Sequence, residues 1–173
     1  NDTLVIVTAD HGESMTDHQR YFCHGSLFEH DLHVPLVAWA PGMKSGTRIA
    51  ARTSHVDILP TLLDYGGAGK LPGFAGQSLR PAIEGASLTA PPFSVAMVGR
   101  NENLRYAVIA DNGLKAVTNG KGGLLEAYDL STDPGETKQA KGSVRAKVRA
   151  LAKDFRAWLK GKTPVPAPKV QTL

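Results

Sequence analysis

Cysteine and long apolar runs are nearly absent from this chain of 173 residues. Its single cysteine, Cys23, excludes an internal disulfide and leaves the redox compartment open. The sequence holds no apolar run as long as a membrane-spanning helix requires. Hydrophobic residues make up 42% and charged residues 21%, which is ordinary for a globular protein. The composition therefore predicts a globular domain that can bury a core of its own.

Aromatic residues are also scarce, and they do not alternate with basic residues in the pattern that stacks on nucleic-acid bases. We therefore predict no nucleic-acid partner. The positive charge is uneven: residues 101–173 carry thirteen Lys or Arg and seven Asp or Glu, whereas residues 1–100 carry seven and nine. Such a basic segment attracts an anionic polymer or a membrane, or it is the solvated face of an amphipathic helix. We favour the helix, because the same segment has a regularly spaced apolar side.

The run from Leu4 to Val7 predicts a strand over residues 3–8 that is buried on both faces, as in a parallel sheet. It stops at Asp10-His11-Gly12, where glycine allows a sharp turn. Ligands of open α/β sheets bind beyond the carboxyl ends of such strands. A carboxylate and an imidazole suit a divalent cation, so Asp10 and His11 are candidate metal ligands. A carboxylate that only caps a helix remains the alternative.

The histidines cluster in the first third of the chain, at positions 11, 18, 24, 30, 33 and 55. The segment His24-Gly25-Ser26-Leu27-Phe28-Glu29 follows the Asp-His pair by thirteen residues. A loop between the two segments would let His11 and His24 face one pocket.

These motifs, in this order, resemble the sulfatase branch of the alkaline phosphatase superfamily. The resemblance covers roughly residues 3 to 160. Further matching segments are Val34-Pro35-Leu36-Val37, Pro41-Gly42, Ser54 to Leu63, Gly76-Gln77-Ser78-Leu79 and Tyr128 to Glu136. The resemblance is specific for the family and uninformative about the substrate.

The resemblance implies a metal-dependent hydrolysis of sulfate esters. Asp10 and His11 match metal ligands that hold one divalent ion, with Ca²⁺ favoured over Mn²⁺ or Zn²⁺. In such enzymes the ion acts as a Lewis acid and a template. His24 matches a Lys or His that contacts the transferred sulfuryl or phosphoryl group. The substrate is thus expected to be a sulfate or phosphate ester.

The signature of a sulfatase nucleophile is missing. In that family a formylglycine arises from a Cys/Ser-x-Pro/Ala-x-Arg motif, which Cys23, followed by His-Gly-Ser-Leu, does not match. We therefore expect a C-terminal part of a longer enzyme, inactive alone, with the formylglycine and further metal ligands in a missing N-terminal half that is its main partner. Homo-oligomers stay open. The alternatives are a phosphodiesterase, phosphonate monoester hydrolase or phosphoethanolamine transferase of the same superfamily, and a non-catalytic binding module derived from the fold.

Several nearby residues fit structural roles better than catalysis. His55 and Asp57 resemble the start of a structural helix in the family, and Glu29 is expected to brace the loop. Cys23 is expected to pack as a small side chain. His18, His30 and His33 are expected in loops or at the surface, although the loop of His18 could border the pocket.

The fold class predicted is α/β: an alkaline-phosphatase-like sheet portion over 1–92, then a small α+β sub-domain over 93–162, then a proline-rich tail over 163–173. The first part should contain a second buried strand over 35–40 and a helix over 56–65 in which Pro60 causes a kink or a later start. Asp111-Asn112-Gly113 and Thr118-Asn119-Gly120 are hairpin turns of an antiparallel meander. A final helix from Ser143 should pack on one face of that meander.

Overall fold

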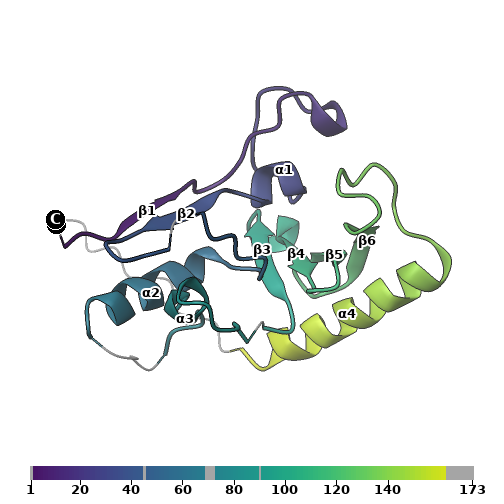
Figure 1. The fold of residues 1–173 in the computed structure, drawn as a ribbon. Helices are drawn as coiled ribbons and strands as arrows, with labels where there is room; N and C mark the ends of the chain where they lie inside the picture. Colours follow the sequence, from purple (N-terminus) through teal and green to yellow (C-terminus); the bar gives the residue numbers. More distant parts are fainter. Residues whose placement is uncertain (1, 45, 69–72, 90, 163–173) are drawn as a thin grey trace, which may run out of the picture.

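The computed structural model describes residues 2–44, 46–68, 73–89 and 91–162, and the predicted tail over 163–173 lies outside them. Two antiparallel sheets and several helices make up the fold (Figure 1). The strands are β1 (Val5–Thr8), β2 (Leu36–Trp39), β3 (Ser94–Val98), β4 (Arg105–Ile109), β5 (Leu114–Asn119) and β6 (Leu124–Asp129). The α-helices are α1 (Glu29–Leu32), α2 (Ile58–Tyr65), α3 (Arg80–Ile83) and α4 (Gly142–Lys160), with 3₁₀ turns at Asp17–Gln19, His55–Asp57 and Asn101–Asn103.

The first strand is neither parallel nor buried on both faces, so that prediction is wrong for the described residues. β1 pairs antiparallel with β2, with Val5 opposite Trp39 and Val7 opposite Val37. These four side chains share one face of the two-stranded sheet, and between 43% and 58% of each is exposed. An apolar run indicates that a strand can be buried, but the elements that cover it come from other parts of the sequence, which the run itself does not specify.

The helix after Ser54 starts late, as Pro60 predicted. A 3₁₀ turn over His55–Asp57 leads into α2, so proline falls in the first turn of the α-helix, where no N–H is needed. The buried Asp57 carboxylate accepts hydrogen bonds from the Ser54 N–H at 2.8 Å and from the Gln77 N–H at 2.9 Å. This carboxylate fixes the segment that leads into the helix.

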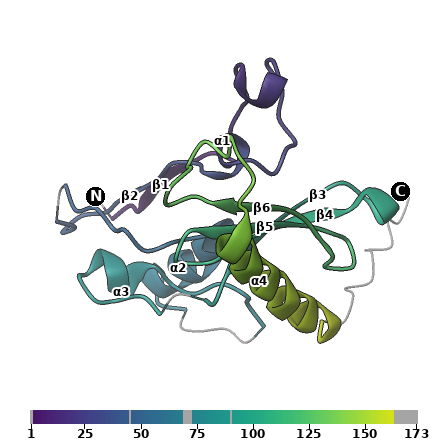
Figure 2. The ribbon, with the colours of Figure 1, turned by 90° about the vertical axis from the view of Figure 1, so that its right-hand side faces the viewer.

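The second sheet is the predicted meander, with strand order β3-β4-β5-β6. Gly113, at φ +82°, closes the β4–β5 turn, a backbone conformation that favours glycine. α4 lies across one face of the sheet, as Figures 1 and 2 both show. Its apolar stripe forms the largest buried cluster together with the sheet, through Val108, Ala116, Ala127, Val148, Ala152 and Phe155.

The other face of the meander packs against the segment that contains α1. Leu27 is buried there with Ala107, Val117 and Tyr128, and Phe28 packs against the same cluster. The meander is thus a middle layer between α4 and α1 (Figures 1 and 2). This arrangement places the loops on either side of α1 directly over the second sheet. In the described part of the chain, no helix combines the length and apolar character needed to cross a membrane.

Candidate functional site

Gly12 fixes how the chain leaves the Asp-His pair. Its N–H donates to the Asp31 carbonyl oxygen at 2.9 Å. A Cβ atom at this position would lie 1.9 Å from the carbonyl oxygen of His30. This oxygen belongs to the backbone, so it cannot move aside as a flexible side chain could. Only glycine therefore lets the turn after β1 lie directly on α1.

The backbone holds the His11 imidazole in one tautomer. Nδ1 lies 2.7 Å from the carbonyl oxygen of Gly12, and since a carbonyl only accepts, Nδ1 carries the proton. This hydrogen bond, together with the charge of Asp10, raises the pKa of His11 above 6.5 although desolvation opposes it. In this tautomer of the neutral ring, Nε2 carries a lone pair, and it lies 3.7 Å from Oδ2 of Asp10. Histidines that bind metals are held in the same way by a backbone carbonyl.

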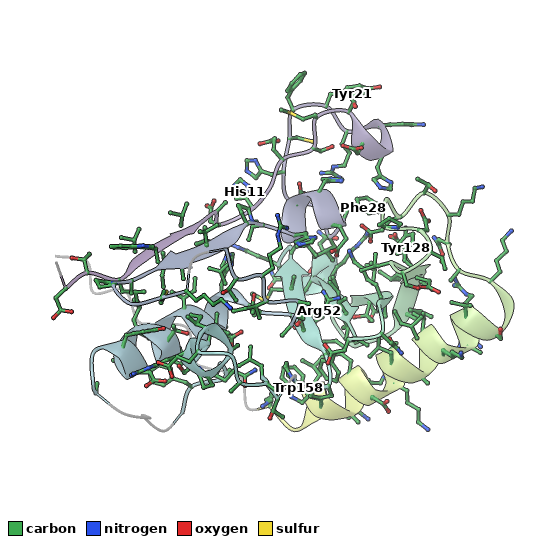
Figure 3. The ribbon with its side chains drawn as sticks, in the orientation of Figure 1. His11, Tyr21, Phe28, Arg52, Tyr128 and Trp158 are labelled. Atoms are coloured by element: carbon green, nitrogen blue, oxygen red, sulfur yellow. The ribbon has the colours of Figure 1, made fainter. Side chains whose placement is uncertain are left out.

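His24 lies directly on His11. The two rings are stacked, with their centroids 4.1 Å apart and their planes 22° from parallel. Nδ1 of His24 lies 3.4 Å from Oε2 of Glu13, a residue that the sequence reasoning did not single out. The structure thus brings together Asp10, His11 and His24, and Figure 3 shows His11 at the end of β1 above the meander.

The Asp10 and His11 pair fits a divalent cation only as part of a ligand set. One carboxylate oxygen and one imidazole nitrogen are suitable donors, and the Asp10 side chain is 90% exposed. Among the residues that the structure describes, no group of three His, Cys, Asp or Glu side chains could hold a metal ion. A metal bound here would need further ligands from water, substrate or other protein residues.

A large cleft opens in front of these side chains, with a volume of about 1020 Å³. It is bordered by the Asp10 and His24 loops, by residues 49–56 and by β3. Arg52 contributes a guanidinium to this cleft and is partly buried there. Figure 3 places it below His11, near β3. No motif marked Arg52 in the sequence, because a single arginine in a loop carries no pattern.

His55 has the structural role that the sequence suggested, although it also borders the cleft. Its Nε2 donates to the carbonyl oxygen of Ala9 at 2.8 Å. This bond joins the start of the α2 segment to the end of β1, one residue before Asp10. His55 therefore steadies the backbone that presents the carboxylate.

The other histidines follow the prediction of loop or surface positions except His30, which lies within α1. His18 does not border the cleft: its ring stacks on Phe28 with centroids 3.7 Å apart, and its Nε2 lies 3.0 Å from the carbonyl oxygen of Gly135. His33 does border the cleft. His30 lies 3.6 Å from the buried carboxylate of Asp31. Cys23 is partly buried in a short backbone bridge with Ser14.

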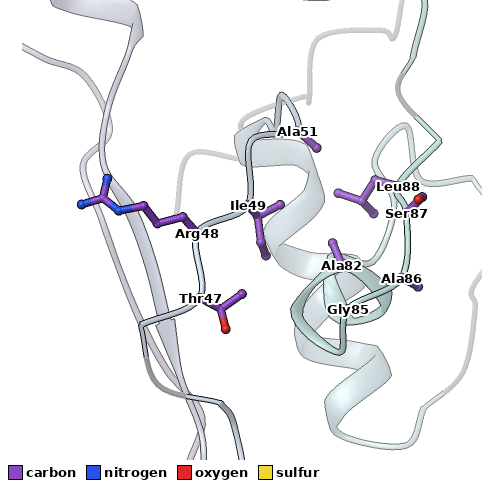
Figure 4. A pocket seen from close by; sticks show the side chains of 9 residues that line it. All are labelled: Thr47, Arg48, Ile49, Ala51, Ala82, Gly85, Ala86, Ser87 and Leu88. Carbon is purple, nitrogen blue, oxygen red and sulfur yellow. The ribbon is translucent and has the colours of Figure 1, made fainter.

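A second cavity of about 430 Å³ offers little chemistry. It lies between residues 47–51 and the α3 segment, and small or apolar side chains form most of its wall (Figure 4). The guanidinium of Arg48 points away from it in that view. The cleft beside His11 is therefore the better candidate for a functional site.

Comparisons with known proteins show which family the chain resembles. A family model described as sulfatase matches residues 1–68. Arylsulfatase K of Xenopus laevis is 31% identical over 166 residues, which cover 90% of this chain and 31% of that protein. The solved structure of a 2-O GAG sulfatase superposes with a TM-score of 0.75 at 27% identity, covering 91% of this chain and 37% of the other. A phosphonate monoester hydrolase from Silicibacter pomeroyi gives 0.71 at 26% identity, covering 91% and 34%. The chain thus spans about a third of the length of these proteins.

Proposed function

Because this chain belongs to the sulfatase family, we propose that it supplies part of the active site of a metal-dependent enzyme that hydrolyses sulfate esters. The observation that carries the proposal is the stacked pair of His11 and His24, with the Asp10 carboxylate beside it, at a cleft of about 1020 Å³. Two imidazoles and a carboxylate lie at the same cleft, which supports a role for them in binding an ester group.

Asp10 and Nε2 of His11 are the residues that would hold the divalent ion, and the carboxylate oxygen of Asp10 is a ligand that suits Ca²⁺. When bound, such an ion polarises the ester oxygen as a Lewis acid. The hydrogen bond from His11 Nδ1 to the Gly12 carbonyl places the proton of the neutral ring on Nδ1, so Nε2 is the nitrogen that can bind the ion.

His24 is assigned to the transferred group. An imidazole N–H donates a hydrogen bond to the oxygen on which charge develops as the ester bond breaks. Glu13, whose Oε2 lies 3.4 Å from Nδ1, orients the ring. Arg52 adds positive charge to the cleft wall, which attracts an anionic ester.

The nucleophile has to come from residues outside this sequence. No Cys/Ser-x-Pro/Ala-x-Arg segment occurs among the 173 residues. Since the chain spans about a third of its relatives, we assign the formylglycine and the remaining metal ligands to a longer protein or a separate chain that completes the cleft.

A phosphonate or phosphate ester is the second candidate substrate, because the phosphonate monoester hydrolase superposes almost as well as the sulfatase. The Asp10, His11 and His24 group serves either reaction. A nucleophile signature of the Cys-x-Pro-x-Arg type would favour sulfate, whereas an unmodified Thr or Ser would favour a phosphoester.

The experiment uses the complete enzyme with aryl sulfate and phosphonate monoester substrates. Asp10→Ala should lower the bound metal and the turnover together, whereas His24→Ala should lower turnover about 10²-fold or more with the metal retained. Asp154→Ala, an exposed carboxylate on α4, is the matched control and should change neither. Full metal content in Asp10→Ala would contradict the assignment of the ligand.

A further inference from the structure

A lysine is completely buried in the middle of the meander. Lys115 lies on β5, on the sheet face that turns toward α1, and its side chain has no exposed surface. Its Nζ lies 3.0 Å from Oε1 of Glu29 and 2.6 Å from Oε1 of Glu136. Removing an ammonium group from water is costly unless it is paired, so both carboxylates are needed to hold it there.

Glu136 binds the backbone of α1 as well as the lysine. Its Oε2 accepts a hydrogen bond at 2.6 Å from the N–H of Glu29, the first residue of the helix. Glu136 is itself buried, and it adopts φ +54°, which is strained for a residue other than glycine. These contacts hold the loop between β6 and α4 against α1.

The opposite end of α1 holds both loops of the candidate site. Oδ2 of Asp31 accepts from the Ser26 N–H at 2.6 Å, two residues after His24. The carbonyl oxygen of the same residue accepts from Gly12, next to His11. Since α1 is only four residues long, a displacement of Glu29 moves Asp31 with it.

We propose that Lys115 and Glu136 are positioning residues, which set the spacing of the His11 and His24 rings from the meander through α1. A buried ion pair adds little net stability compared with apolar packing, so its use at this place points to precise placement. Lys115 and Glu136 do not border the cleft themselves, whereas Glu29, which both of them contact, does. The part of this proposal that concerns turnover rests on the proposed function, whereas the part that concerns geometry does not.

The geometric part is tested by amide hydrogen exchange on this chain. Glu136→Gln removes the charge while its amide oxygen can still accept from Glu29, and Lys115→Met removes the ammonium. In both variants the amides of Gly12 and Ser26 should exchange about tenfold faster relative to the amide of Val108 in β4. The resonances of the His24 ring should shift as well, since it lies 4.1 Å from His11.

Val148→Ala is the control for a purely structural effect, because it lowers stability from the α4 side of the sheet. Its Gly12 and Ser26 exchange should rise only as much as that of Val108. If Glu136→Gln shows the same uniform pattern, the positioning proposal is overturned. Should Lys115→Met fail to fold, Glu136→Gln still decides the question, since it keeps the shape of the side chain.

The catalytic part is tested in the complete enzyme. Glu136→Gln should lower kcat about tenfold with KM and bound metal unchanged, and Val148→Ala should leave kcat unchanged at a temperature where it is folded. An unchanged kcat in Glu136→Gln, despite faster exchange at Gly12 and Ser26, would overturn this part alone. If the parent enzyme cleaves no sulfate ester, the proposed function fails, and the exchange experiment still decides the geometry.

Discussion

Phe155 is the side chain that anchors α4 to the meander. It is fully buried, and its ring centroid lies 5.1 Å from that of Tyr106 and 6.0 Å from that of Phe93, both edge-on. A buried phenylalanine removes about 150–250 Å² from water, which corresponds to about 4–6 kcal/mol at about 25 cal/mol/Å². Alanine retains part of this, so Phe155→Ala should lower the free energy of unfolding by about 3–5 kcal/mol.

The assay is urea denaturation of the chain, with unfolding monitored by far-UV circular dichroism. A lower midpoint with an unchanged m-value would show that stability alone has changed. Lys153→Gln, on the exposed side of the same helix, is the control and should shift the free energy of unfolding by about 0.5 kcal/mol or less. Arg156 is exposed too, but it is a poorer control, because its guanidinium donates to the carbonyl oxygen of Gly122 at 3.2 and 3.3 Å.

A Phe155→Ala variant as stable as the parent would refute the docking of α4. The basic residues of the helix would then belong to a free segment, and binding to an anionic polymer would become the better interpretation of their charge.

Three further predictions concern the candidate site. The chain of 173 residues alone should release no sulfate from aryl sulfates, with or without Ca²⁺ or Mn²⁺, and multiple turnover would contradict the missing nucleophile. Gly12→Ala should destabilise the protein by about 1–3 kcal/mol in the same denaturation assay, because the new Cβ meets the His30 carbonyl. Burial raises the pKa of Asp31, but the hydrogen bonds from Ser26 outweigh it and leave the pKa below 3.8. The stabilising effect of Asp31 is therefore present above the pKa of the unfolded chain and is lost as the pH falls through the lower folded pKa, so Asp31→Asn should show a smaller loss of stability below about pH 4.

Local patterns determined much of the fold. The turn at Asn112-Gly113, the late start at Pro60 and the helical spacing of Val148 and Phe155 each depend on a few neighbouring residues, so the sequence alone predicts the meander, α2 and α4. The order of the Asp10, His11 and His24 motifs likewise indicated the family before any geometry was known.

Long-range contacts decided the rest. β1 gained an antiparallel partner and one exposed face, because a run of Val and Ile carries no information about which strand will cover it. Arg52 lines the cleft, whereas His18 stacks on Phe28 away from it. Both positions depend on the course of loops, which have no periodic sequence pattern. Lys115 is the clearest case: a lysine in a strand is ordinarily solvated, and its burial depends on Glu29, 86 residues earlier, and on Glu136. The sequence shows which side chains are charged, but the oppositely charged partners that allow a charge to be buried come close to it only in the folded chain.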